Sequence, residues 1–179
     1  MSPAIQHQNA IALVPIIQAL PLFIECRHLA VYCPIKGEMS PLPILELALR
    51  QGKHCYLPVI HPDQTGHLAF VEVKTDDPLT PNRFGILEPV YEPTRTLLPE
   101  ALDVVLTPLV AFDNQGRRLG TGGGYYDRTF SFLKRDPKPK KPALIGLAYA
   151  FQHIQELPEE SWDILLTGIL TENQFIPIP

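Results

Sequence analysis

The feature of this sequence that most restricts its fold is a short apolar run that ends at a proline and leads into a cluster of glycines. The run over residues 104–107 stops at Pro108, and four glycines fall within residues 120–124. Glycine lets backbone N–H groups crowd around an anion without clashes from Cβ atoms. The flanking Arg118 adds a cationic donor, and Asp127 becomes a candidate metal or hydroxyl partner. A strand followed by such a loop predicts an α/β protein that holds a phosphate at a strand end.

The first half of the chain alternates helix and strand patterns. We expect a helix over residues 11–20 that Pro21 ends, and a second helix with Ser40 as N-cap and Pro41 at its first position. Strands are predicted at residues 28–32, 54–60 and 68–73. A helix between two buried strands is typical of a crossover in a parallel sheet.

The second half continues this alternation. Further strands are expected at residues 103–107, at 143–149 and within 164–171. The helix after the glycines has Tyr126, Phe130 and Leu133 on one face, and residues 134–142 form a basic, proline-broken linker. We therefore predict one domain over residues 1–179, a Rossmann-like three-layer α/β/α sandwich with a mostly parallel, mixed sheet and its ligand site at the sheet edge or switch point.

Composition excludes several classes of protein. A net charge of −4 argues against a protein whose main partner is nucleic acid. No apolar run reaches the roughly 20 residues of a membrane span, and the chain start lacks the pattern of a secretory signal. The three cysteines form no CxxC pair, and the histidines form no metal-binding pair. We expect a cytoplasmic, monomeric protein with free thiols and no membrane partner.

The glycine cluster matches neither of the well-known phosphate fingerprints. A Walker A loop needs lysine where Tyr125 stands, and a dinucleotide loop needs glycine at Tyr125 or Asp127. The alternative is a tight structural turn. One or two glycines suffice for an ordinary turn, so four glycines beside Arg118 and Asp127 favour an anion-binding loop.

The segment from Pro108 to Arg128 resembles the signature of the 5-formyltetrahydrofolate cyclo-ligase family, also called 5,10-methenyltetrahydrofolate synthetases. The similar positions within it are Pro108, Phe112, Asp113, Gly116, Arg118, Leu119, Gly120, Gly122, Gly124, Tyr125, Tyr126, Asp127 and Arg128. The resemblance extends over residues 28–173, through Tyr32, Glu38, Gly52, Lys53, Leu57, Pro58, Phe70, residues 85–89, residues 145–149, Gln152, Trp162, Asp163 and Thr171.

The resemblance implies an enzyme that closes a ring in 5-formyltetrahydrofolate, with or without a polyglutamate tail, to give 5,10-methenyltetrahydrofolate. It also implies that ATP and Mg²⁺ are required, and that Arg118 and Tyr125 are catalytic. The implied ATP-binding residues are Arg118, Leu119, Gly120, Thr121, Gly122, Gly123, Gly124, Tyr125 and Tyr126. The implied folate-binding residues are Glu38, Phe70, Thr121, Gly122, Gly123, Gly124 and Tyr125.

Asp127 and Asp163 are the implied Mg²⁺ ligands, since a hard cation prefers carboxylate oxygens. Each role has a simpler alternative. Asp127 could serve only as a negative charge at a helix start, Asp163 and Glu38 as solvated carboxylates, and Phe70 and Tyr126 as core residues.

One departure from the family pattern concerns the N-terminus. The family usually begins with a basic helix that reaches the ATP phosphates, whereas this chain has no lysine or arginine before Arg27. Either Lys36, Arg117 or Arg128 compensates, or ATP binding is weaker, or the true start lies upstream. A folate- or nucleotide-binding protein with lost turnover is therefore a second hypothesis, and a sugar-phosphate isomerase or CoA transferase a third.

Overall fold

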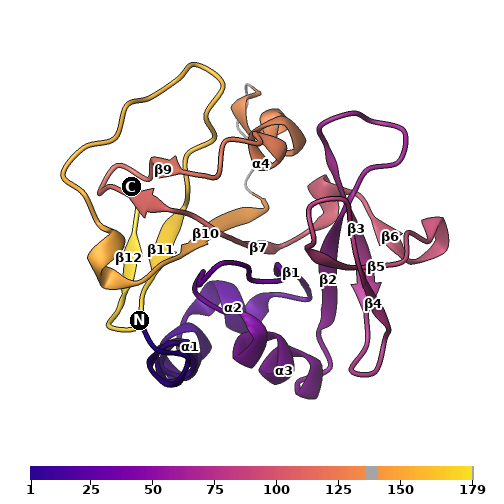
Figure 1. Ribbon diagram of the computed structural model, residues 1–179, viewed down its shortest axis with the longest axis horizontal. Coiled ribbons are helices and arrows are strands. Elements are labelled where there is room, and N and C mark those ends of the chain that lie inside the picture. The colour runs from indigo at the N-terminus through magenta and orange to yellow at the C-terminus, as the bar shows by residue number, and fades with distance from the viewer. Residues whose placement is uncertain (136–140, 179) are drawn as a thin grey trace.

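The computed structural model describes residues 1–135 and 141–178, and it contains one large sheet (Figure 1). The strands follow the order β12-β11-β10-β7-β1-β2-β3-β6. Their bounds are β1 His28–Ala30, β2 His54–Ile60, β3 Leu68–Val73, β6 Thr96–Leu97, β7 Val104–Thr107, β10 Ala143–Leu147, β11 Gly168–Leu170 and β12 Phe175–Pro177. The strands from β11 to β2 are mutually parallel, whereas β3 and β12 run antiparallel to their inner neighbours. The predicted mostly parallel, mixed sheet is confirmed.

Helical segments cover both faces of this sheet. On one face lie α1 Pro3–Gln18, α2 Pro21–Glu25 and α3 Leu42–Arg50, and on the other lie α4 Tyr125–Thr129 and the 3₁₀ turn η3 Ser131–Lys134 (Figure 1). Successive strand residues point to opposite faces, so Leu29 packs with the α1–α3 layer and Ala30 with the α4 layer. All four residues of β7 are buried, because helical segments cover both faces of the sheet. The predicted three-layer sandwich is confirmed.

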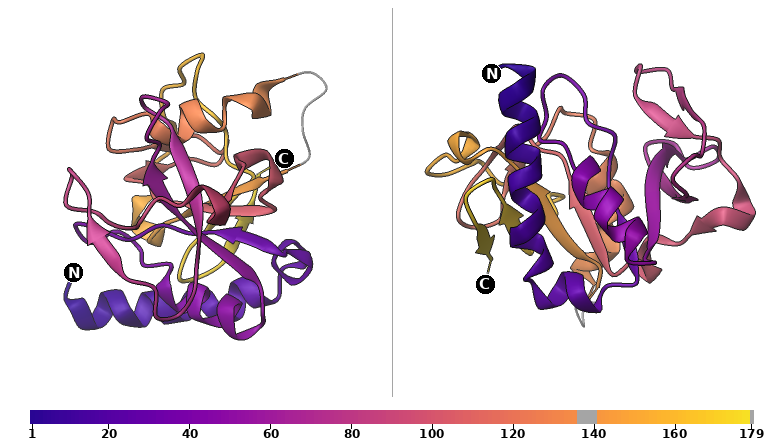
Figure 2. Two further views of the ribbon diagram at one scale, coloured as in Figure 1. Left: turned by 90° about the vertical axis from the view of Figure 1, so that its right-hand side faces the viewer. Right: turned by 90° about the horizontal axis from the view of Figure 1, so that it is seen from below.

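Short elements complete the chain. Two small hairpins stand beside the main sheet, β4 Leu79–Pro81 with β5 Leu87–Pro89, and β8 Ala111–Phe112 with β9 Arg118–Leu119. The β4–β5 hairpin projects from the β3 side of the molecule (Figure 2). Short 3₁₀ turns lie at η1 Pro93–Arg95, η2 Pro99–Ala101 and η4 Ala150–Gln152. Within the described residues, no helix is both long and apolar enough to cross a bilayer.

The prediction for the first helix was wrong at both of its ends. The helix α1 begins at Pro3, and Ser2 caps it by accepting a hydrogen bond from the Ile5 N–H at 3.4 Å. Its first half has little apolar periodicity, because Ala10 is the first residue that the fold buries. The helix also continues through Pro15, which is exposed. The polar composition of residues 3–9 therefore gave no helical pattern, although Ser2 as N-cap and Pro3 start the helix there.

Other boundaries differ by smaller amounts. Strands β2 and β3 have the predicted bounds, whereas β1 and β10 each end two residues early. The helix α3 begins at Leu42 with Pro41 in the N-cap position, and Ser40 accepts from the Leu42 N–H at 3.3 Å from one residue further back. The predicted linker over residues 134–142 lies partly outside the described residues.

The order of the strands creates a switch point between β1 and β7. From β1 the chain proceeds through α3 to β2 on one side, and from β7 it proceeds to β10 on the other side. Loops that leave neighbouring parallel strands in opposite directions open a crevice at the carboxyl ends of those strands. The loop after β1 carries Glu38, and the segment after β7 carries the glycines, so the fold brings two predicted binding segments to this crevice.

Candidate functional site

The glycine loop, residues 120–124, joins β9 to α4 and exposes its backbone. Gly124 has a φ of +63° and immediately precedes α4, a left-handed conformation that favours glycine. Among the described residues, a Cβ added at Gly120 or Gly122 would find no neighbouring atom within 4 Å. Leu119 and Thr121 are also exposed. The backbone of this loop is therefore open to solvent at Gly120 and Gly122.

Arg118 and Asp127 form an ion pair beneath this loop. Arg118 Nη2 donates to Asp127 Oδ1 at 2.8 Å, and Arg118 Nη1 donates to the Ile164 carbonyl at 2.6 Å. The same Oδ1 accepts from the Ile164 N–H at 3.1 Å. The Arg118 side chain is only 7% exposed. The predicted phosphate donor and the predicted Mg²⁺ ligand are thus brought together, each neutralising the other in this structure.

Asp163 precedes Ile164, whose backbone bonds to both members of this ion pair. Its Oδ2 accepts from the Glu160 N–H at 2.9 Å in a local turn, and the following residue, Ile164, bonds to Asp127. Within residues 1–135 and 141–178, no group of three or more His, Cys, Asp or Glu residues is arranged to hold a metal ion. Mg²⁺ usually takes only one or two carboxylates and completes its shell with waters and substrate phosphates. Among the described residues, no hydrogen bond uses Asp127 Oδ2 or Asp163 Oδ1, and the role of these two carboxylates in holding Mg²⁺ stays a prediction.

Of the three residues proposed to compensate, the two arginines already bond to other parts of the protein. Arg117 donates from Nη1 to the Leu157 carbonyl at 2.8 Å, and it pairs with the buried Asp113 and with Glu159. Arg128 donates from Nε to the Gly66 carbonyl at 2.8 Å and from Nη2 to the Gly123 carbonyl. Arg128 therefore ties the glycine loop to the turn between β2 and β3, and Arg117 stabilises the acidic segment beside β8.

Tyr125 begins α4 and reaches a hairpin that is distant in sequence. Its hydroxyl accepts from Arg83 Nη2 at 2.9 Å, and the Phe84 ring meets its ring edge-on at 6.3 Å between centroids. The Arg128 guanidinium lies 5.4 Å from the centroid of the same ring. Our sequence analysis missed Arg83 and Phe84, although the neighbouring residues 85–89 belong to the resemblance.

Tyr126 lies in α4 just after the glycine loop, and Glu38 acts on it electrostatically. Its ring stacks on Phe130 at 6.3 Å, which is the core packing that the sequence left open. Burial raises the pKa of the Tyr126 hydroxyl, the Glu38 carboxylate raises it further, and the Arg118 guanidinium opposes both. Glu38 and Arg118 therefore both act electrostatically on this hydroxyl, in opposite directions.

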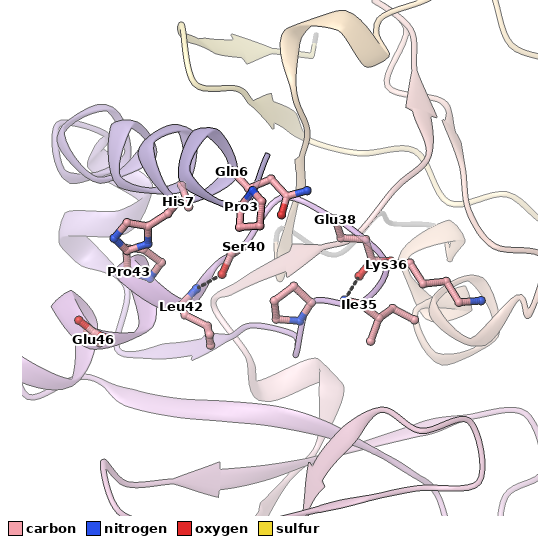
Figure 3. Close-up of a pocket in the computed structure, with 13 residues that line it drawn as sticks. Pro3, Gln6, His7, Ile35, Lys36, Glu38, Ser40, Leu42, Pro43 and Glu46 are labelled. Atoms are coloured by element: carbon pink, nitrogen blue, oxygen red, sulfur yellow. Dashed lines mark hydrogen bonds between the residues drawn. The ribbon is translucent and has the colours of Figure 1, made fainter. Parts of the chain in front are cut away.

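A cavity of about 390 Å³ lies between α1, the loop after β1 and the start of α3 (Figure 3). Its lining residues are Pro3, Gln6, His7, Ala10, Pro34, Ile35, Lys36, Gly37, Glu38, Ser40, Leu42, Pro43 and Glu46. A helix thus occupies the N-terminal position, but it presents Gln6 and His7 instead of lysine or arginine. The third proposed compensating residue, Lys36, is exposed at this cavity.

The loop after β1 holds Glu38 in a defined orientation. Lys36 and Gly37 have φ angles of +49° and +82°, and this tight turn lets Glu38 Oε2 accept from the Ile35 N–H at 3.0 Å. Tyr149, which follows β10, donates to the Glu38 carbonyl at 3.5 Å. Burial raises the pKa of the Glu38 carboxyl, while the Ile35 N–H and Lys36 partly offset the rise. One oxygen of this carboxylate is left for a ligand.

Phe70 is not among the residues that the fold brings to the crevice. It lies on β3 with no exposed surface, and its ring packs on Phe130 at 5.7 Å in the core beneath α4. The alternating pattern of β3 carries no signal that separates a pocket wall from a core residue. The structure gives Phe70 a packing role, and its predicted contact with folate stays a prediction.

The fold defines an α/β sandwich in which both predicted binding segments follow strands at the switch point of the sheet. The sequence profile of the 5-formyltetrahydrofolate cyclo-ligase family matches residues 1–172. The chain is 40% identical over 146 residues to the 5-formyltetrahydrofolate cyclo-ligase of Haemophilus influenzae, which covers 82% of this chain and 76% of that protein. The corresponding Escherichia coli K12 protein is 39% identical over 155 residues, covering 86% of this chain and 82% of the relative.

Solved structures agree with these sequence relatives. The 5,10-methenyltetrahydrofolate synthetase of Aquifex aeolicus superimposes with a TM-score of 0.81 at 31% identity, covering 99% of this chain and 85% of that chain. A synthetase from Mycoplasma pneumoniae gives a TM-score of 0.69 at 25% identity, covering 96% of this chain and 90% of that chain. The chain belongs to the 5-formyltetrahydrofolate cyclo-ligase family. The resemblance in its residues and the expected enzyme class, a ligase of folate one-carbon metabolism, are thereby confirmed.

Proposed function

We propose that this enzyme converts 5-formyltetrahydrofolate and ATP into 5,10-methenyltetrahydrofolate, ADP and phosphate in a Mg²⁺-dependent reaction. The observation that carries the proposal is the meeting of two segments at the β1–β7 switch point. The segment after β7 carries an open glycine backbone, the loop after β1 carries a carboxylate with a spare oxygen, and Glu38 acts electrostatically on Tyr126 beside the glycines. This arrangement suits a reaction between a phosphorylated substrate and a planar heterocycle that carries N–H donors.

The chemistry requires activation of a poor leaving group. The formyl oxygen attacks the γ-phosphorus of ATP, the bond to the bridging oxygen breaks, and ADP leaves. N10 then attacks the formyl carbon, the carbon–oxygen bond breaks to release phosphate, and N10 loses its proton. Little covalent chemistry falls to the protein, so its residues act mainly by positioning reactants and balancing charge.

The glycine loop would hold the phosphates through its exposed N–H groups, because no atom of residues 1–135 or 141–178 lies within 4 Å of a Cβ added at Gly120 or Gly122. Tyr125 would bond to the phosphate tail from the start of α4. Asp127 and Asp163 would hold Mg²⁺, which supplies charge neutralisation for the phosphates when bound. Arg118 is ion-paired with Asp127. We therefore propose that Arg118 orients this carboxylate toward the metal and also stabilises the charge of the phosphates.

Glu38 would recognise the pterin. A carboxylate can accept two parallel hydrogen bonds from the amino group and ring N–H of a pterin, which fixes a planar ring in one orientation. The raised pKa of Glu38 reflects a partly desolvated site, where such hydrogen bonds are stronger than in water. The adjoining cavity is large enough to accept part of this ring system.

The direct test follows formation of the methenyl product by absorbance, with and without ATP and Mg²⁺. We expect turnover only when both are present. Glu38→Gln should raise the KM for 5-formyltetrahydrofolate, whereas Glu46→Gln, a carboxylate of the same cavity on α3, should not. Turnover without ATP would contradict the proposal.

A second candidate, a binding protein with little or no turnover, is favoured by one observation. Helix α1 contains no lysine or arginine, so it brings no permanent positive charge to the crevice. This candidate predicts saturable binding of ATP and 5-formyltetrahydrofolate without product formation, so the same assay combined with calorimetric titration separates the two.

A further inference from the structure

We propose that Arg83, at the tip of the β4–β5 hairpin, binds an oxyanion of a substrate beside the glycine loop. The proposal rests on the proposed function and supplies a cation that α1 lacks. Arg83 is exposed, yet its Nη2 is held 2.9 Å from the Tyr125 hydroxyl at the start of α4. A positive charge from another part of the fold therefore contacts the side chain of the residue that follows the glycine loop.

The hydrogen bonds of the nearby arginines single out Arg83. Arg118 uses both terminal nitrogens on Asp127 and Ile164, and Arg128 uses Nε and Nη2 on backbone carbonyls. Arg117 is engaged by an acidic cluster. Within the described residues, the only hydrogen bond of the Arg83 guanidinium is to the uncharged Tyr125 hydroxyl. A guanidinium has five N–H donors, so most of those of Arg83 are left for a ligand.

The hairpin tip that carries Arg83 is preorganised. Asn82 Oδ1 accepts from the Phe84 N–H at 2.9 Å and from the Ile86 N–H at 3.1 Å, and Gly85 takes a left-handed φ of +76°. Asn82 also donates to Glu88 Oε2 at 2.9 Å, and that carboxylate accepts from Ile60 on β2. The turn is thus closed by its own side chain and anchored to the main sheet, which lowers the entropic cost of binding.

The aromatic neighbours keep the guanidinium close to the loop. Its central carbon lies 4.9 Å from the Phe84 ring centroid, and the Phe84 ring meets Tyr125 edge-on. Such cation–π contact leaves the edge of the guanidinium free for hydrogen bonds. An oxyanion between Arg83 and the loop backbone would receive donors from both sides. The ligand chemistry is a phosphate or a carboxylate, from the tail of ATP or the glutamate of the folate.

Calorimetric titration of the purified protein with MgATP, and separately with 5-formyltetrahydrofolate, tests the proposal. Arg83→Met keeps the apolar stem and removes the charge, and Arg83→Lys keeps the charge. Arg50→Met is a control in the last turn of α3, which leads into the amino end of β2. Arg83→Met should lower the affinity for one of the two ligands about tenfold or more, as expected for loss of a charge-assisted hydrogen bond. Arg83→Lys should recover part of the loss.

The two titrations distinguish the sources of the oxyanion. Weaker binding of MgATP alone assigns the phosphates, and weaker binding of the folate alone assigns its carboxylate. A loss in Tyr125→Phe equal to that in Arg83→Met, with no recovery in Arg83→Lys, would mean that Arg83 only holds the hairpin in place and would overturn the proposal. Binding of both ligands within twofold of wild type would also overturn it. Failure of wild type to form product while it still binds MgATP would instead count against the proposed function.

Discussion

Replacement of Gly120 by alanine separates a ligand-binding loop from a structural turn. Gly120 does not have a left-handed φ, and an added Cβ would meet no atom within 4 Å in the part of the chain that the structure describes. The substitution therefore introduces neither strain nor a clash in the free protein. Alanine also restricts the unfolded chain, so we expect the free energy of unfolding to stay unchanged or rise by up to about 1 kcal/mol.

Binding should respond in the opposite direction. A phosphate that accepts hydrogen bonds from the loop N–H groups must approach the backbone closely, and the new methyl group would occupy part of that space. We expect MgATP affinity to fall at least about tenfold, which corresponds to roughly 1.4 kcal/mol. A stable protein with impaired nucleotide binding is the signature of a functional glycine.

Gly122→Ala is the matched comparison. Its surroundings are equally open, but its φ of +90° makes alanine unfavourable. We expect a loss of stability of about 1 to 2 kcal/mol in addition to weaker binding. Urea denaturation measures the first quantity and calorimetric titration the second. If Gly120→Ala binds MgATP as tightly as wild type, the loop backbone does not contact the nucleotide and our reasoning is refuted.

Three further predictions concern charged groups. Arg118→Ala leaves the Asp127 carboxylate without its cation and the Ile164 carbonyl without its donor, so urea denaturation should show a loss of about 2 to 3 kcal/mol; no loss would contradict the ion pair. Asp113→Ala removes a fully buried carboxylate that accepts three backbone N–H bonds. Urea denaturation should show that the free energy of unfolding falls by about 2 to 4 kcal/mol, and a change below about 1 kcal/mol would contradict this role. Because burial raises the pKa of Glu38 above 4.5, its contribution to stability is present below that pH and lost as pH rises through the raised value. Glu38→Gln should therefore match wild type in stability on the acidic side and exceed it at neutral pH, and equal stabilities at both would contradict the desolvated environment.

Strong local patterns made much of the fold predictable. Strands β2 and β3 were located to the residue, because each is an apolar run bounded by turn residues. The alternation of these runs with helices was sufficient for the three-layer class. The start of α1 could not be predicted by the same reasoning, because its first turns are polar and stay exposed.

The site was less predictable because it depends on contacts distant in sequence. The glycines marked the loop, but nothing local indicated that Arg118 would be paired with Asp127 and nearly buried. Arg83 lies 42 residues from Tyr125, and only the folded hairpin brings the two together. The resemblance implied that Phe70 contacts folate, and only the folded structure shows that its ring is buried against Phe130.

The most direct test of the central claim is a titration of ¹⁵N-labelled protein, followed through its backbone amide signals. MgATP should shift the amides of residues 120–124 most strongly, and 5-formyltetrahydrofolate should shift those of residues 35–38, because the two segments meet at the β1–β7 switch point. Shifts confined to the opposite edge of the sheet, or none at saturating concentrations of either ligand, would contradict the account.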